Sequence, residues 1–122
     1  MVVTSSYEEA VYKVRRESFD VALLDLLMPA ESFTLGSAAI VEHLGREIGA
    51  EFPLIFVMVL CGIKKIAVVT DGNHHQHPVV ATVDWLCNNE FTVNGSRVLI
   101  QYAQLTTEGA KDWAKTFTDL LD

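Results

Sequence analysis

The chain has 122 residues, of which 50% are hydrophobic and 20% are charged, and its formal net charge at pH 7 is −7. This length and composition predict a single globular domain, residues 1–122, with one hydrophobic core. An acidic chain with only nine Lys and Arg residues argues against nucleic acid or an anionic membrane surface as a partner.

Neither a membrane span nor a secretion signal is indicated. The longest apolar run, residues 53–62, has about half of the roughly 20 residues that a spanning helix needs. The chain does not open on the basic and apolar regions of a signal peptide. Cys61 and Cys87 form no CxxC pair and have apolar neighbours, which is typical of reduced, buried thiols. We therefore expect a cytoplasmic protein.

The first third of the chain is predicted to contain a strand, a helix and a second strand. Residues 1–4 form a β-branched run that favours a strand. Ser6 and Glu9 form a capping box, and the apolar residues after it recur at helical spacing, which predicts an amphipathic helix over 7–18. The continuous apolar run at 21–24 is typical of a strand buried on both faces. Together these elements predict a right-handed βαβ unit.

The middle of the chain predicts a helical crossover to another buried strand. Residues 37–48 show helical spacing, which Gly45 weakens. Residues 52–62 are apolar on all sides, so periodicity leaves helix and strand open. Their length, their closing glycine and the need for a crossover favour a buried helix. Residues 66–69 then form a short apolar strand, and a further helix is predicted over 78–86.

The last part of the chain predicts a hairpin, a core strand and a final helix. Asn94 and Gly95 stand between β-prone residues, which favours a tight hairpin over 91–98. Residues 98–102 are predicted to be the last core strand. Thr107 is expected to cap an amphipathic helix that runs to the end of the chain. Alternation of strands and helices predicts a three-layer α/β domain with a doubly wound, mainly parallel sheet of about four strands.

Residues 7–29 (YEEAVYKVRRESFDVALLDLLMP) resemble the response-regulator receiver domain, the flavodoxin-like fold of two-component signalling. In that family a helix carrying "eAl" precedes a strand with "DlvllDlxMP", and EAV and DVALLDLLMP stand in those places here. The resemblance implies that Asp25 occupies the phosphoacceptor position and that Thr70, ending the next strand, contacts the phosphoryl group. Tyr102 is an approximate match to the family's aromatic switch residue.

The chain departs from the receiver pattern at three places. It begins about one βα unit too late to contain the strand whose two acidic residues hold Mg²⁺. Residues 103–105 replace the family's Lys-Pro, and the nearest lysine, Lys111, is predicted to lie in the final helix. Asp71 stands where the family has a small residue. Because nothing then holds Mg²⁺ or neutralises the phosphoryl charge, we expect a degenerate or truncated receiver that is defective in phosphorylation of Asp25.

The absent first strand also has a consequence for assembly. In the family it lies between the strands that match residues 1–4 and 21–25. Its loss would expose a sheet edge or force these neighbours to pair directly, and exposed edges seek partners. We expect a homodimer or a strand-exchanged oligomer that acts as a signalling or protein-interaction module rather than as a catalyst.

Three of the four histidines lie in the turn that follows the strand at 66–69. The carboxyl ends of parallel strands share one edge of a sheet, the usual ligand site of open α/β folds. This edge brings together carboxylates and imidazoles that suit Zn, Mn, Fe or Ni, namely Asp25, Asp71, His74, His75 and His77. The alternative is that Asp71 and its neighbours supply turn hydrogen bonds while the histidines cap a helix or face solvent.

The metal interpretation gives an alternative function, a small metal-binding protein or a metal-dependent hydrolase. In the hydrolase, Asp25 would be a nucleophile or metal ligand, and a histidine of the turn would be the general base. The chain contains no Gly-rich phosphate loop and no GxSxG motif that would indicate another chemistry.

Overall fold

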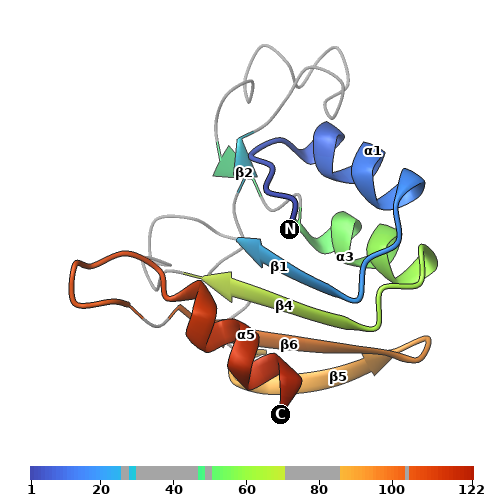
Figure 1. The fold of residues 1–122 in the computed structure, drawn as a ribbon. Coiled ribbons are helices and arrows are strands. Elements are labelled where there is room, and N and C mark those ends of the chain that lie inside the picture. The colour runs from blue at the N-terminus through green and yellow to red at the C-terminus, as the bar shows by residue number, and fades with distance from the viewer. Residues whose placement is uncertain (26–27, 30–46, 49–50, 71–85, 104) are drawn as a thin grey trace.

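The computed structural model describes residues 1–25, 28–29, 47–48, 51–70, 86–103 and 105–122. In this part of the chain, four strands form one sheet with helices on both faces, and two short strands form a separate ladder (Figure 1). The helices are α1 (Tyr7–Arg16), α3 (Glu51–Leu60) and α5 (Trp113–Leu121). The strands are β1 (Val21–Asp25), β2 (Met28–Pro29), β3 (Glu47–Ile48), β4 (Lys65–Thr70), β5 (Asn89–Val93) and β6 (Ser96–Tyr102).

The main sheet has the strand order β1-β4-β6-β5. β1, β4 and β6 run parallel, whereas β5 is antiparallel to β6 and joins it through the Asn94-Gly95 turn. α3 lies in the connection between the parallel strands β1 and β4. The prediction of a mainly parallel α/β sheet of four strands is therefore confirmed, with the hairpin strand β5 as its fourth member.

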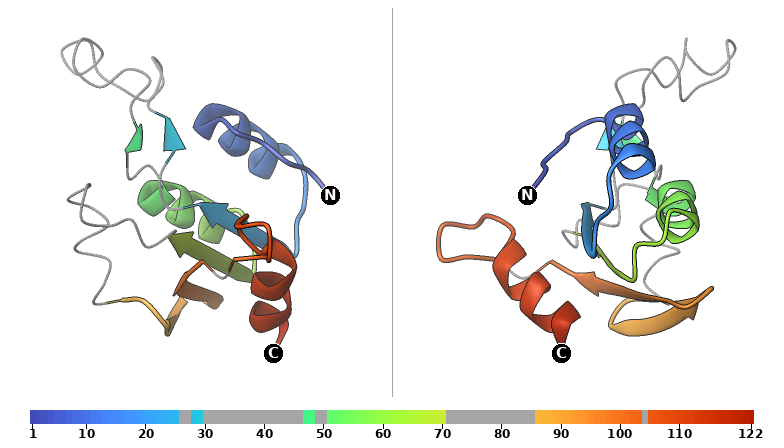
Figure 2. Two further views of the ribbon diagram at one scale, coloured as in Figure 1. Left: turned by 90° about the vertical axis from the view of Figure 1, so that its left-hand side faces the viewer. Right: turned by 45° about the vertical axis from the view of Figure 1, so that its right-hand side comes forward.

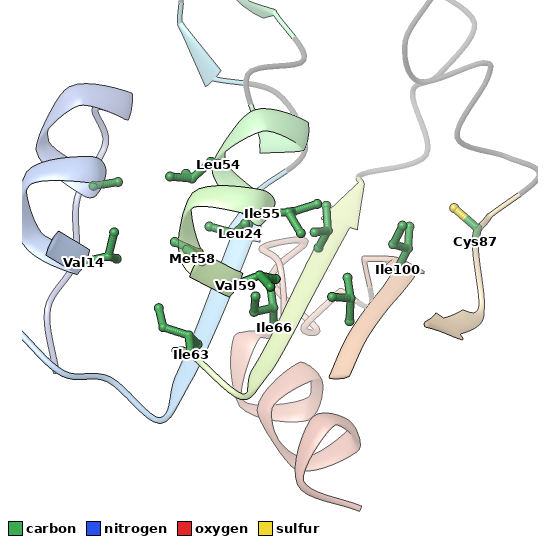
Figure 3. Close-up of a cluster of buried hydrophobic side chains, with 13 residues drawn as sticks. Val14, Leu24, Leu54, Ile55, Met58, Val59, Ile63, Ile66, Cys87 and Ile100 are labelled. Carbon is green, nitrogen blue, oxygen red and sulfur yellow. The ribbon is translucent and has the colours of Figure 1, made fainter. Parts of the chain in front are cut away.

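The helices divide unequally between the two faces of the sheet. α1 and α3 lie side by side over one face, and α5 lies against the other (Figures 1 and 2). Alternation along β4 directs Ile66 and Val68 toward α3, where Leu54, Met58 and other apolar side chains enclose them (Figure 3). This cluster is the main hydrophobic core, and Leu54, Ile63 and Ile66 in it are at most 2% exposed.

Two local predictions are confirmed at the level of single hydrogen bonds and dihedral angles. Ser6 caps α1, because its hydroxyl accepts a hydrogen bond of 3.2 Å from the Glu9 amide. Asn94 and Gly95 have φ of 48° and 84°, the positive pair that a type I′ hairpin requires. Gly62, also at positive φ, follows the last turn of α3 and ends the predicted buried helix.

The prediction of a strand over residues 1–4 is wrong. The segment pairs with no strand of the described chain, and Val3 is 78% exposed. A strand needs a neighbour to satisfy its backbone groups, and the segment instead enters a turn in which the Thr4 hydroxyl donates to the Ser6 carbonyl at 3.3 Å. The expected βαβ unit made from residues 1–4, α1 and β1 is therefore absent.

Two predicted helices lie mostly outside the described residues. Of the helix expected over 37–48, only Glu47 and Ile48 are described, and they form strand β3 paired with β2. Their helical assignment is wrong because antiparallel partners at Met28 and Pro29 take up their backbone groups. Of the helix expected over 78–86, only Leu86 is described, and it belongs to a turn.

The final helix begins later than predicted. Thr107 does not cap it: α5 starts at Trp113, and the Asp112 carboxylate accepts from the Lys115 amide at 3.0 Å. Residues 106–110 form a turn instead, because the Thr106 amide donates to the Ala110 carbonyl at 2.7 Å and Gly109 adopts a φ of 86°. This shift places Lys111 in the connection between β6 and α5.

Candidate site at the carboxyl edge of the sheet

The three parallel strands end together at one edge of the sheet. Asp25 ends β1 and pairs in register with Val69, while Thr70 ends β4 and pairs with Tyr102 at the end of β6. The structure thus confirms that Asp25 and Thr70 end adjacent parallel strands at the same edge. A side chain at the end of β1 is free to meet groups from the connections beyond the sheet, the arrangement expected at an open α/β ligand edge.

Asp25 forms an ion pair with Lys111 at this edge. The Lys111 Nζ donates to Asp25 Oδ2, although 86 residues separate the two along the chain. The Asp25 side chain is 43% exposed, whereas the Lys111 side chain is only 20% exposed. The ammonium is therefore held against the sheet, and the carboxylate keeps one side open to solvent. A lysine beside the carboxylate neutralises its charge and supplies donors to any further acceptor that binds there.

The connection between β6 and α5 is folded in a way that presents Lys111. Leu105 and Lys111 form an isolated antiparallel bridge, which closes the turn at 106–110. Within that turn the Gly109 amide donates to the Thr106 carbonyl at 2.9 Å, and the Ala110 amide donates to the Thr106 hydroxyl at 3.3 Å. The loop backbone therefore fixes where the lysine stem begins, rather than leaving the ion pair to position it.

A hydrogen bond connects this lysine directly to α5, because the Trp113 amide donates to the Lys111 carbonyl at 3.2 Å. Asp112, the next residue, caps the helix, and its carbonyl accepts from the Thr116 amide at 3.2 Å. The buried Thr116 hydroxyl donates to the same carbonyl at 3.3 Å and accepts from the Gln101 side-chain amide at 3.2 Å. The first turn of α5 is thus bonded both to the Lys111 segment and to β6. A change in the position of Lys111 would alter these hydrogen bonds at the beginning of α5.

Glu108 is the titratable group of this loop with a clear pKa shift. Hydrogen bonds to its carboxylate from its own backbone amide and from the hydroxyls of Thr107 and Thr106 lower the pKa of Glu108 below its ordinary value. The group is fully exposed, so the shift reports local bonding in the turn and not burial. The ionised carboxylate is therefore a further element that holds the loop in shape.

The proposed metal ligands other than Asp25 lie outside the described residues. These are Asp71, His74, His75 and His77, so the structure does not test whether they approach Asp25. In the described ranges, no three side chains of His, Cys, Asp or Glu gather in a way that could hold a metal ion. Among the described residues, the ion-pair partner of Asp25 is Lys111 and not a carboxylate.

The sequence analysis does not predict Lys111 as the partner of Asp25, because helical spacing around Lys111 places it in the final helix. Gly109 and Asp112 are the local signals against that helix: a glycine interrupts a helix, and aspartate is a preferred N-cap residue. The pairing with Asp25 itself had no local signal, since its partner lies on a distant strand.

Comparison of the chain with protein-family models, with curated proteins and with solved structures gave no match. Among the described helices, none has the length and apolar character needed to cross a membrane.

Proposed function

We propose that this chain is a receiver-like signalling and protein-interaction domain, of flavodoxin-like type, in which Asp25 occupies the phosphoacceptor position. The Asp25–Lys111 ion pair carries the proposal, since it lies at the carboxyl edge of three parallel strands with Thr70 ending the neighbouring strand. The receiver family has a lysine after the last strand of the sheet, and residues 103–105 of this chain contain no lysine at that place. Lys111 supplies that lysine from a different position, the turn before α5.

The proposal includes a defect in ordinary phosphotransfer. Phosphoryl transfer to a carboxylate needs a divalent cation to neutralise the charge that develops on the transferred group. The described part of the edge offers Asp25 and Lys111 but no further carboxylates gathered around them. This feature favours a domain that signals by a change in contacts rather than by a phosphorylation cycle.

The output surface of the proposed module is the beginning of α5. Lys111 holds Asp25 on one side, and Asp112 caps α5 on the other. A protein partner that engages Asp25 or displaces Lys111 would shift the capping residue with it. The partner proposed for this domain is therefore another signalling protein, and the proposed location is the cytoplasm, in keeping with Cys61 and Cys87, which form no disulfide with each other.

Hydrogen exchange on charge-removing variants tests this coupling. Lys111→Met and Asp25→Asn are each expected to speed amide exchange in residues 105–116, while β4 and α3 stay protected. Lys13→Met is the matched control, because Lys13 forms an exposed ion pair with Glu17 on α1 at 3.7 Å, away from the edge. Unchanged exchange at the start of α5 in both edge variants would refute the coupling.

A phosphodonor assay tests the defect separately. Intact mass measured after incubation with acetyl phosphate and Mg²⁺ is expected to show no phosphoryl adduct on the wild-type chain. Beryllofluoride is likewise expected to leave the amide spectrum of the edge unchanged. An adduct that disappears in Asp25→Asn would contradict the proposed defect while supporting the receiver-like assignment.

A second candidate function is a small metal-binding protein or a metal-dependent hydrolase. It is favoured by the exposed carboxylate of Asp25 beside the strand that ends at Thr70, directly before Asp71 in the sequence. The proposed ligands are Asp25, Asp71, His74, His75 and His77. Stoichiometric Zn, Mn or Fe in the purified protein, lost in His74→Ala and His75→Ala, would favour this candidate over the signalling module.

A further inference from the structure

β1 has an outer edge that no strand of the described chain occupies. β4 pairs with one side of β1, and the strand order places β1 at the end of the sheet. Val21, Ala22 and Leu23 are all only half-buried, although their composition is that of a central strand. The strand contains no lysine, no proline and no bulge, the devices that ordinarily protect an edge from pairing with another chain.

The segment 1–4 has the properties of a strand without a partner. Val2 and Val3 are 42% and 78% exposed, and with Thr4 they form a β-branched run without a charged side chain. In Figures 1 and 2 the segment extends from the start of α1 on the side of β1 that faces away from β4. An exposed apolar strand former and an apolar edge that no described strand occupies therefore belong to the same surface of the molecule.

We propose that the segment 1–4 of one copy pairs with the outer edge of β1 in a second copy, and that the exchange is reciprocal. Only Ser5 and Ser6 connect the segment to α1, and both its turn and its cap are bonded there. The Thr4–Ser6 hydrogen bond and the Ser6 cap hold the base of the segment at the start of α1, and in this conformation the segment pairs with no strand of the described chain. Short connections of this kind favour exchange between copies.

Charge distinguishes this pairing from direct pairing of two β1 strands. Asp20 precedes β1 and Asp25 ends it, so an antiparallel β1–β1 ladder would place acidic residues of the two copies near each other. The segment 1–4 contains no acidic side chain and brings no such repulsion. It also buries Val2 and Val3, which the single chain leaves in water. The exchanged dimer has two equal interfaces related by a twofold axis.

Cysteine cross-linking between copies tests the contact. In a Cys61→Ser background, which removes the exposed native thiol, chains with Val3→Cys are mixed with differently tagged chains carrying Ala22→Cys or Leu23→Cys. The side chains at 22 and 23 point to opposite faces of β1, so in either register one of the two positions lies on the same face as residue 3 of the other chain. A disulfide between the two kinds of chain is expected. Thr118→Cys, exposed on α5, is the control position and is expected to form none.

Oligomeric state provides the second measurement. Sedimentation is expected to show a monomer–dimer equilibrium that Val3→Pro shifts to monomer, since proline removes a ladder donor, while Val3→Ile keeps the dimer. A monomer at all concentrations, a dimer insensitive to Val3→Pro, or an intrachain disulfide alone in the Val3→Cys/Ala22→Cys double variant would each overturn the proposal. None of these variants alters Asp25 or Lys111, so failure here is distinct from failure of the proposed signalling function.

Discussion

The conformation of Gly109 determines where Lys111 lies relative to the sheet edge. Its φ of 86° is a conformation that side-chain-bearing residues rarely adopt, and it lets the chain turn back so that Lys111 pairs with Leu105. Without that turn, helical spacing would carry α5 upstream through residue 111. The ion pair with Asp25 thus depends on a glycine that touches neither partner. A residue's role at this site is set by the loop that presents it as much as by its own chemistry.

The pKa shift of Glu108 predicts a pH dependence of this loop. Because the folded pKa of Glu108 is depressed, its carboxylate stabilises the folded loop above the ordinary value of 4.5, and that contribution is lost as pH falls through the folded pKa. Amide exchange in residues 106–110, corrected for intrinsic rates, should therefore rise at acidic pH in the wild type. Glu108→Gln should flatten this dependence. An equally steep rise in the variant would show that another group is responsible.

Ser96 is the buried hydroxyl whose removal should be costly. Its side chain is fully buried and donates to the Ile63 carbonyl at 2.6 Å, joining the start of β6 to the connection between α3 and β4. Ser96→Ala leaves that carbonyl without its partner and should lower the free energy of unfolding by about 1–3 kcal/mol. Thr118→Ala, which removes an exposed hydroxyl bonded to the Ala114 carbonyl at 3.0 Å, should change it by less than about 0.5 kcal/mol. Denaturant titration measures both, and equal losses would contradict this assignment.

At the scale of elements, strong local patterns predicted the structure and weak ones did not. α1 has a capping serine, β5 and β6 have an Asn-Gly turn, and β4 has a continuous apolar run; all three predictions are confirmed. α5 was predicted to begin too early, because its apolar spacing continues upstream of the true cap. Helical spacing identifies a face but does not by itself locate the residue at which a helix starts.

The cap of α5 provides a direct test at this scale. Asp112→Ala removes the carboxylate that accepts from the Lys115 amide and should destabilise the protein by about 0.5–2 kcal/mol. Thr107→Ala removes the residue that spacing alone suggested as the cap and should have a much smaller effect. Thermal unfolding followed by circular dichroism distinguishes them. A larger loss for Thr107→Ala would restore the longer helix.

Across the whole molecule, different helices cover the two faces of the sheet. α1 and α3 enclose the main cluster on one face, while α5 covers the other and is tied to the hairpin through Arg97, which pairs with Glu90 and donates to the Leu120 carbonyl. Most of the stability gained from apolar burial therefore comes from the α3 face. The α5 face depends more on hydrogen bonds and ion pairs.

Substitutions along α3 should separate core from surface. Leu54 is fully buried, and Leu54→Ala should lower the free energy of unfolding by about 2–5 kcal/mol because it leaves a cavity between α3 and the sheet. Phe56 lies two residues later and is 56% exposed. Phe56→Ala should lower the free energy of unfolding by less than about 1 kcal/mol, since more than half of the side chain is already in water. Chemical denaturation with both variants measures the difference, and similar costs would place the core elsewhere.

The sequence by itself determined the positions of α1, β1, α3, β4 and the β5–β6 hairpin, because caps, turns and apolar periodicity act over about ten residues or fewer. Only the tertiary structure decided that β5 adds to the sheet as an antiparallel edge, that residues 1–4 pair with no strand of the described chain, and that Lys111 contacts Asp25. These outcomes depend on which distant backbone edges and charges come into contact. The last of them joins residues 86 positions apart, and no local pattern specifies such a contact.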